Sequence, residues 1–216
     1  MHKSAIIERT RGYVRSKFET EGTGHDWWHI ERVLNSALAI NKKERADPFI
    51  VELGALLHDI ADFKFNGGDA AAGGKAAREW LEGIGADPAT TDAVCHIVDN
   101  VSFKGLGEKN GMASLEGKIV QDADRLDAIG AIGVARAFAY GGYKGRPLFD
   151  PAGRTKDGSF EDYKKGSDST IHHFYEKLLH VKDLMNTSTG KRLAARRHRF
   201  IERYLEEFDA EWNGKR

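Results

Sequence analysis

Apolar residues recur at helical spacing through most of the chain. Segment 4–20 places Ile7, Val14 and Phe18 at intervals of seven and four, which puts them on one stripe of a helix. The same spacing continues through segments 28–46 and 48–60. Because we find no convincing alternation of apolar and polar residues, the sequence predicts an all-α fold without strands.

Capping residues indicate where further helices begin. Asp69 is expected to cap a helix that runs to about Gly83, and Asp87, which a proline follows, is expected to begin another. Asp47 stands in the same relation to Pro48. The last 48 residues, from position 169 onwards, predict two helices with a break at 187–190.

Two stretches of the C-terminal half depart from this regular pattern. Residues 115–139 are densely apolar and contain Gly130 and Gly133, which would allow close helix packing. Residues 141–168 hold six glycines and two prolines and show almost no periodicity. A loop of this length is uncommon inside a compact domain, so it predicts a lid, a binding loop or a surface excursion. Its lysines and arginines would suit an anionic ligand.

Length and charge narrow the class of protein. The 216 residues permit one domain or two small ones, and we expect a single domain over 1–216. The 33 basic residues balance 33 acidic residues, so we expect no broad nucleic-acid binding, although a local cationic pocket remains compatible with this balance. Uncharged runs reach only nine residues, and the N-terminal segment carries charges and lacks a small-residue cleavage site. We therefore expect neither a membrane span nor a signal peptide.

The cysteine content restricts the chemistry of any metal site. Cys95 is the only cysteine in the sequence, which excludes an internal disulfide framework and a thiolate zinc cluster and fits a cytoplasmic location. A metal would therefore be held by carboxylates and by some of the nine histidines.

Three segments, 24–29, 57–62 and 121–127, concentrate side chains that can bind a metal. The second is the most unusual, because His58 and Asp59 follow directly on a strongly apolar helix. A buried carboxylate is costly unless it is paired or bound to a metal. Asp62 projects from the same helix face. Taken alone, such a dipeptide could equally be a surface pair or a helix cap.

Asp124 shares this environment within the third segment. Apolar residues flank it on both sides, and Asp127 lies on the same helix face three positions later. An isolated aspartate in an apolar helix can instead bond to a neighbouring cap or arginine. An upstream histidine, a His-Asp pair and a downstream aspartate together point more strongly to a metal site.

The spacing of His29, His58-Asp59 and Asp124 resembles the H…HD…D pattern of the HD-domain metal-dependent phosphohydrolases. The chain is most similar to the bacterial YpgQ/YedJ-like subgroup. The likeness lies in the stretches GHDWWHIERV (24–33), GALLHDIAD (54–62), IVQDADRLDAIGAIGVAR (119–136), STIHHFYEKLL (169–179) and TSTGKRLAARRHRFIERYLEEF (187–208). His25-Asp26 is a second HD dipeptide, but no apolar run precedes it, so we assign the metal dyad to His58-Asp59.

The resemblance implies a single-domain, HD-type helical bundle in which His29, His58, Asp59 and Asp124 bind one divalent ion in a core cleft. A mixed nitrogen and oxygen set suits Mn, Fe, Co, Ni or Zn better than Mg, and we favour Mn²⁺. Such an ion polarises a phosphoryl group and lowers the pKa of its bound water. Asp62 matches the acidic position that orients or deprotonates this water, although relatives often carry glutamate there. Alternatively, Asp62 ends its helix in contact with solvent.

The resemblance also suggests five substrate-binding residues. His96 would line the site, although its apolar neighbours also fit a core histidine that bonds to the backbone. Arg125 would bind phosphate or orient a neighbouring carboxylate, and Asp127 would contact a ribose hydroxyl. Lys177 and Lys182 would neutralise a substrate phosphate, or else lie on a solvated helix face.

The implied activity is hydrolysis of a (d)NTP to the monophosphate and pyrophosphate, with a nucleotide as the small-molecule partner. A 5′-nucleotidase is the alternative within the enzyme class. A metal- or nucleotide-binding sensor without catalysis is the alternative outside it. Relatives also suggest a homodimer.

Overall fold

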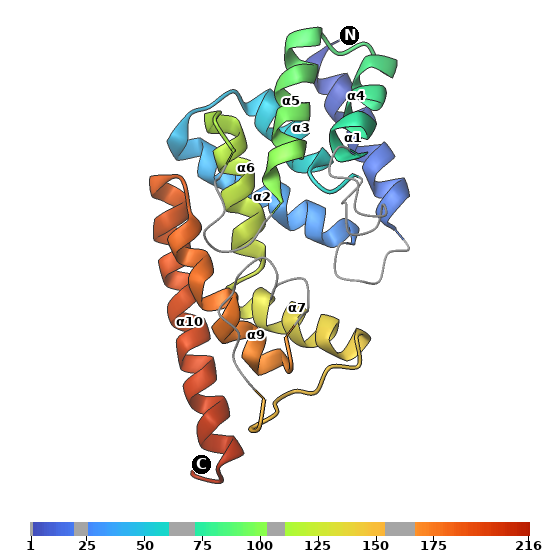
Figure 1. Cartoon of the computed structure of the whole chain (residues 1–216). Helices are drawn as coiled ribbons and strands as arrows, with labels where there is room; N and C mark the ends of the chain where they lie inside the picture. Colours follow the sequence, from blue (N-terminus) through green and yellow to red (C-terminus); the bar gives the residue numbers. More distant parts are fainter. Residues whose placement is uncertain (1, 20–25, 61–71, 103–110, 154–166) are drawn as a thin grey trace. The chain divides into compact units, whose positions relative to one another are not determined.

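The computed structural model describes residues 2–19, 26–60, 72–102, 111–153 and 167–216 (Figure 1). Every regular element in these ranges is a helix, so the predicted all-α fold class is confirmed. The described residues up to 124 form one compact unit, and those from 125 onwards form a second. The extent of a single domain over 1–216 stays a prediction.

The described part of the first unit contains five helices and most of a sixth. Leu53, Leu56 and Leu57 of α3 are fully buried, because α3 packs against the neighbouring helices α1, α2 and α5. α4 packs along α5. The helices are α1 (Lys3–Phe18), α2 (Trp27–Glu44), α3 (Pro48–Leu57), α4 (Ala72–Gly83), α5 (Pro88–Val101) and α6 (Leu115–Asp127), whose last three residues belong to the second unit.

Aspartate side chains begin three of these helices. Asp26, Asp47 and Asp87 each accept a hydrogen bond from a backbone N–H in the first turn of the helix that follows. The predicted starts of α3 and α5, each at a proline after an aspartate, are therefore confirmed. The predicted cap at Asp69 lies outside the described residues.

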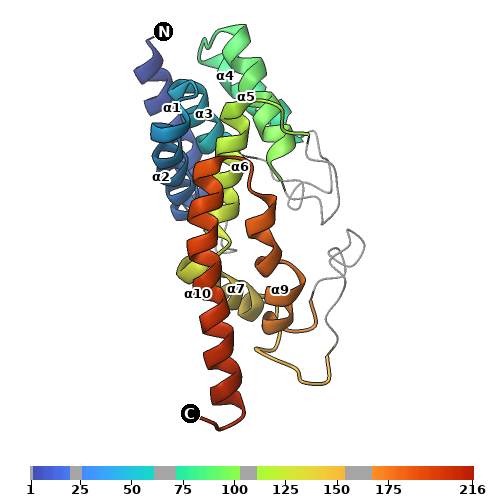
Figure 2. The same cartoon turned by 90° about the vertical axis from the view of Figure 1, so that its left-hand side faces the viewer.

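The second unit contains α7 (Gly130–Tyr143), α9 (Thr170–Glu176), the 3₁₀ helix η1 (Leu178–Leu184) and α10 (Ser188–Trp212). Figure 2 shows α10 as a long helix, and it packs against α7 and η1. The predicted break at 187–190 is confirmed, because Thr187 caps α10. A second break, at Lys177, was not predicted and separates α9 from η1.

The apolar stretch 115–139 divides into α6 and α7. Gly130 begins α7 with φ +78°, and its Cα faces the side chain of Arg197 on α10. This part of the predicted close packing is confirmed. Gly133 instead faces the carbonyl of Ala128, in the preceding turn of the chain, so it serves a local turn and not an approach of two helices.

The described part of segment 141–168 is more ordered than predicted. Residues 141–143 belong to α7, and the backbone N–H groups of Thr170 and Ile171 donate to the carbonyls of Pro147 and Leu148. The ring of Phe149 lies against those of Phe208 and Trp212. Residues 154–166 lie outside the described residues, so a lid stays a prediction. Among the described residues, no helix is both long and apolar enough to cross a membrane.

Candidate metal centre

Three helices of the first unit contribute the candidate ligands. His29 lies in the first turn of α2 and is fully buried. His58 ends α3, Asp59 follows it, and both are buried. Asp124 lies on α6 with 30% of its side chain exposed. The end of α3 is apolar because it forms part of the core, so the His-Asp dyad emerges inside the protein.

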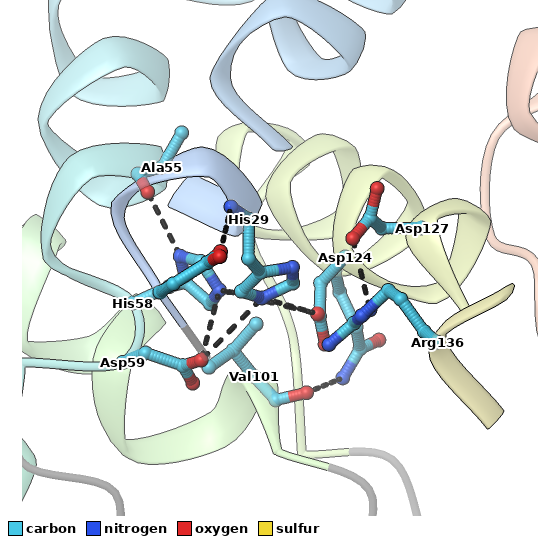
Figure 3. Close-up of polar contacts among 10 residues, drawn as sticks. His29, Ala55, His58, Asp59, Val101, Asp124, Asp127 and Arg136 are labelled. Carbon is cyan, nitrogen blue, oxygen red and sulfur yellow. Dashed lines mark hydrogen bonds and ion pairs between the residues drawn. The ribbon is translucent and has the colours of Figure 1, made fainter. Parts of the chain in front are cut away.

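The four side chains converge on a small volume (Figure 3). The Nε2 atoms of His29 and His58 lie 3.2 Å apart, and Oδ2 of Asp59 lies 3.4 Å from the first and 3.5 Å from the second. Oδ1 of Asp124 lies 3.5 Å from Nε2 of His29 and 3.9 Å from Nε2 of His58. The ligand atoms of His29, His58 and Asp59 all lie within 4.8 Å of one another.

This spacing fits one shared cation. Ligands about 2.1 Å from one ion lie about 3.0 Å apart at right angles and about 3.4 Å apart in a tetrahedron. Four of the five observed distances, 3.2 to 3.5 Å, are close to the tetrahedral value, and the distance between Asp124 and His58 is longer at 3.9 Å. Asp59 is only 8% exposed, and a carboxylate buried to this degree needs a compensating positive charge. The donor set therefore suits a divalent ion in both distance and charge.

The second nitrogen of His58 fixes the state of its ring. Nδ1 lies 2.8 Å from the backbone carbonyl of Ala55. A carbonyl only accepts, so Nδ1 carries a proton and donates it, and Nε2 is the nitrogen that remains to bind a metal. A ring nitrogen that donates to a carbonyl is the usual partner of a metal-binding one. His58 is therefore oriented for ligation.

The Asp124 segment of α6 is tied to α5. Gln121, one turn before Asp124, is buried, and its Nε2 donates to the carbonyls of Asn100 and Val101 at the end of α5. This contact fixes the axial position of α6 within the first unit. The side chain of Asp124 is thereby held beside the two histidines.

The other sequence candidates lie in different settings. Asp62, the predicted catalytic residue, and His25 lie outside the described residues. His96 is exposed on α5, beside the amide of Asn100, so the interpretation as a core histidine is wrong. Its predicted role in lining the site stays a prediction.

The remaining candidates belong to the second unit. Nη1 of Arg125 donates to the carbonyl of Leu184, which is compatible with the predicted orienting role but uses one face of the guanidinium. Lys182 pairs with the adjacent Asp183 at 2.9 Å, and Lys177 lies at the junction of α9 and η1. Their predicted contacts with phosphate stay predictions.

Asp127 is buried and already has a partner. Its Oδ2 accepts a hydrogen bond from Nη1 of Arg136 at 2.9 Å, and only 4% of its side chain is exposed (Figure 3). The predicted contact with a ribose hydroxyl stays a prediction. Sequence reasoning did not identify Arg136, because the pair joins α6 to α7 across a turn that the apolar pattern did not show.

Sequence reasoning also overlooked two groups that support the ligands. The Ala55 carbonyl is invisible in a sequence because it belongs to the backbone. Asp26 was set aside with His25 as the second HD dipeptide, yet its side chain caps the helix of His29. The spacing of an aspartate three residues before His29 is that of a helix cap and could have identified it.

Comparisons with known proteins agree with this geometry. The HD domain family matches residues 27–129. The chain is 38% identical over 208 residues to YpgQ of Bacillus subtilis strain 168, across 96% of this chain and 94% of the relative.

Two solved structures are similar along nearly the whole chain. A crystal structure of an HD-superfamily hydrolase from Bacillus thuringiensis is 42% identical, covers 98% of this chain and 99% of its own, and has a TM-score of 0.77. The crystal structure of Bacillus subtilis YpgQ in complex with ADP is 36% identical, covers 95% of this chain and 97% of its own, and has a TM-score of 0.73.

Proposed function

Since the chain belongs to the HD domain family and is a metal-dependent phosphohydrolase, we propose that it hydrolyses nucleotides, most specifically a (d)NTP to the monophosphate and pyrophosphate. The observation that supports this best is the convergence of two imidazole nitrogens and two carboxylates in one buried group. A nucleotide as substrate class is supported by the ADP complex of the YpgQ relative.

His29, His58, Asp59 and Asp124 would hold the ion. Their two nitrogens and two oxygens suit Mn, Fe, Co, Ni or Zn better than Mg, and among these ions we favour Mn²⁺. When bound, a divalent ion polarises a phosphoryl oxygen and lowers the pKa of a water molecule towards neutrality. The protonated Nδ1 of His58, held by Ala55, keeps Nε2 directed at the ion. This contact also prevents the ring from rotating away.

The proposed reaction adds water to the α-phosphorus and breaks the bond to the bridging oxygen between the α- and β-phosphorus atoms. Asp62 would act as the base that accepts a proton from the attacking water. His96, Arg125, Lys177 and Lys182 are proposed to balance the negative charge of the phosphates.

The test is a nucleotide panel assayed for two products. Purified protein with Mn²⁺ is offered deoxynucleoside and ribonucleoside triphosphates, diphosphates and monophosphates, and pyrophosphate and orthophosphate are measured separately. We expect pyrophosphate from triphosphates without orthophosphate, and no product after chelation of the metal. Orthophosphate from monophosphates would select the 5′-nucleotidase instead. If the protein bound metal but formed no product from any nucleotide, the non-catalytic sensor would be the only remaining interpretation.

A further inference from the structure

The geometry points to Asp26 as a positioning residue for the metal ligand His29, an inference that rests on the proposed metal site. Asp26 belongs to the HD dipeptide that the metal dyad does not use. Its task would be to fix the first turn of α2, so that Nε2 of His29 reaches the other ligands without rearrangement.

The hydrogen bonds of the Asp26 cap are made with the backbone N–H of His29, the candidate metal ligand. Oδ1 of Asp26 accepts from the backbone N–H of His29 at 2.9 Å, and the Asp26 carbonyl oxygen lies 3.0 Å from the same nitrogen. The carbonyl also accepts from the N–H of Ile30. Asp26 itself is extended, with φ −78° and ψ 173°, as a residue that precedes a helix should be. The backbone of His29 is thus held from the residue that begins the helix.

A second contact holds the same turn from another helix. Trp27 is buried, and the guanidinium of Arg15 on α1 lies 5.9 Å from the centre of its ring. Asp26 and Trp27, which are adjacent in the chain, therefore both restrain the first turn of α2. His29 lies in this turn, and its Nε2 is 3.2 Å from Nε2 of His58.

A small displacement of this turn would move His29 and weaken metal binding. Ligand atoms must lie within a few tenths of an ångström of their positions around an ion, and changes in supporting contacts usually cost 10- to 100-fold in metal affinity. Asn caps a helix as well as Asp, whereas Ala does not. Asp26→Asn therefore preserves the hydrogen bond to His29 and removes only the charge, while Asp26→Ala removes both.

The chain provides a matched control in the same unit. Asp87 caps α5 with the same geometry, since its Oδ1 accepts from the N–H of Thr90 at 2.9 Å. Asp87→Ala removes an equivalent cap from a helix that contributes none of the four ligands. Each alanine variant is expected to lower the melting temperature of the metal-free protein by about 3 °C.

The experiment is calorimetric titration of metal-free protein with Mn²⁺, in the absence of any nucleotide. We expect Asp26→Ala to raise the dissociation constant by about 10-fold or more. Asp26→Asn and Asp87→Ala should stay within about twofold of the unsubstituted protein.

Three results would overturn the inference while leaving the metal site in place. These are unchanged affinity in Asp26→Ala, equal weakening in Asp26→Ala and Asp87→Ala, and equal weakening in Asp26→Asn and Asp26→Ala. Equal weakening in Asp26→Ala and Asp87→Ala would mean that metal affinity follows general stability. Equal weakening in Asp26→Asn and Asp26→Ala would mean that it follows the charge of Asp26. Absence of Mn²⁺ binding by the unsubstituted protein would instead overturn the metal site, and with it both proposals.

Discussion

His58 and Asp59 are adjacent in the chain, yet the environment gives them separate tasks. The ring of His58 is held through Ala55 and offers an imidazole nitrogen, whereas Asp59 offers a carboxylate next to both histidines. A neutral ligand can be replaced at modest electrostatic cost, but a buried carboxylate that faces a cation cannot.

We therefore expect Asp59→Ala to abolish both metal content and turnover. Asp62→Ala should keep the metal and slow turnover by about 10²- to 10⁴-fold, as expected for loss of a general base. Elemental analysis of the purified variants and the pyrophosphate assay check the two properties separately. If Asp59→Ala retained its metal, the metal-binding dyad would have to be assigned to His25-Asp26 instead.

His173 is an ionisable residue of the second unit that the metal site does not use. Burial, together with the positive charges of Lys177 and Arg146, lowers the pKa of its ring from 6.5 to about 3. Its Nδ1 lies 3.3 Å from the hydroxyl of Ser167, and that hydroxyl donates to Glu176. His173 therefore stays neutral in the folded protein over the whole physiological range of pH.

This shift predicts a loss of stability in acid. The unfolded chain binds a proton at His173 near pH 6.5, and the folded chain only near pH 3. Between these values the unfolded state holds more protons, so the free energy of unfolding falls as the pH is lowered, by at most ~1.4 kcal/mol per pH unit. Above pH 6.5 this effect is absent.

His173→Gln should flatten the decline in melting temperature between pH 6.5 and pH 4.5. The matched control is His180→Gln, which removes an exposed ring and should leave the decline as steep as in the unsubstituted protein. An unchanged slope in His173→Gln would contradict the assignment.

At the scale of elements, the turn between α6 and α7 depends on one glycine. Gly130 has φ +78°, where a side chain is strained, and an added Cβ would lie 3.0 Å from Cγ of Arg197. Arg197 also donates from Nη1 to the carbonyl of Leu126 near the end of α6. Arg197 of α10 therefore contacts both the turn, at Gly130, and the end of α6, at Leu126.

Gly130→Ala should therefore destabilise the protein for two reasons, backbone strain and displacement of Arg197. Gly145→Ala is the matched control in the same unit, because Gly145 has φ +65° with open space around it. We expect each variant to lose about 1–2 kcal/mol from strain, and Gly130→Ala to lose about 1 kcal/mol more. Urea unfolding of metal-free protein measures the difference, and equal losses would show that Arg197 adapts without cost.

At the scale of the whole molecule, the candidate ligands connect parts of the chain that are distant in sequence. His29 comes from α2, His58 and Asp59 from the end of α3, and Asp124 from α6. An ion that binds this arrangement and not the unfolded chain stabilises the folded state by mass action.

We expect Mn²⁺ at about 100 times its dissociation constant to add ~2.7 kcal/mol to the free energy of unfolding. For a chain of this length, the melting temperature should rise by about 5–10 °C relative to protein in chelator. Thermal unfolding followed by circular dichroism measures this rise. Asp59→Ala should melt at one temperature in both conditions, and a rise in that variant would place the stabilising ion elsewhere.

The helices could be predicted where one local rule decided them. Asp87 followed by proline begins α5, and Thr187 begins α10, because a cap satisfies backbone groups within its own turn. The break at Lys177 and the exposure of His96 could not be predicted. Both depend on which neighbouring helix covers each face, and the spacing of apolar residues along one helix contains no such information.

The sequence by itself determined the all-helical fold and the chemistry of the candidate metal ligands, because helical spacing and residue type are local properties of the chain. Only the tertiary structure decided that Nε2 of His29 and Nε2 of His58 meet at 3.2 Å beside Asp59. It likewise decided that Ala55 sets the tautomer of His58, that Arg136 pairs with Asp127, and that Asp26 belongs to His29. These contacts depend on backbone atoms and on distances between helices, and burial makes them strong because water no longer competes for the same partners.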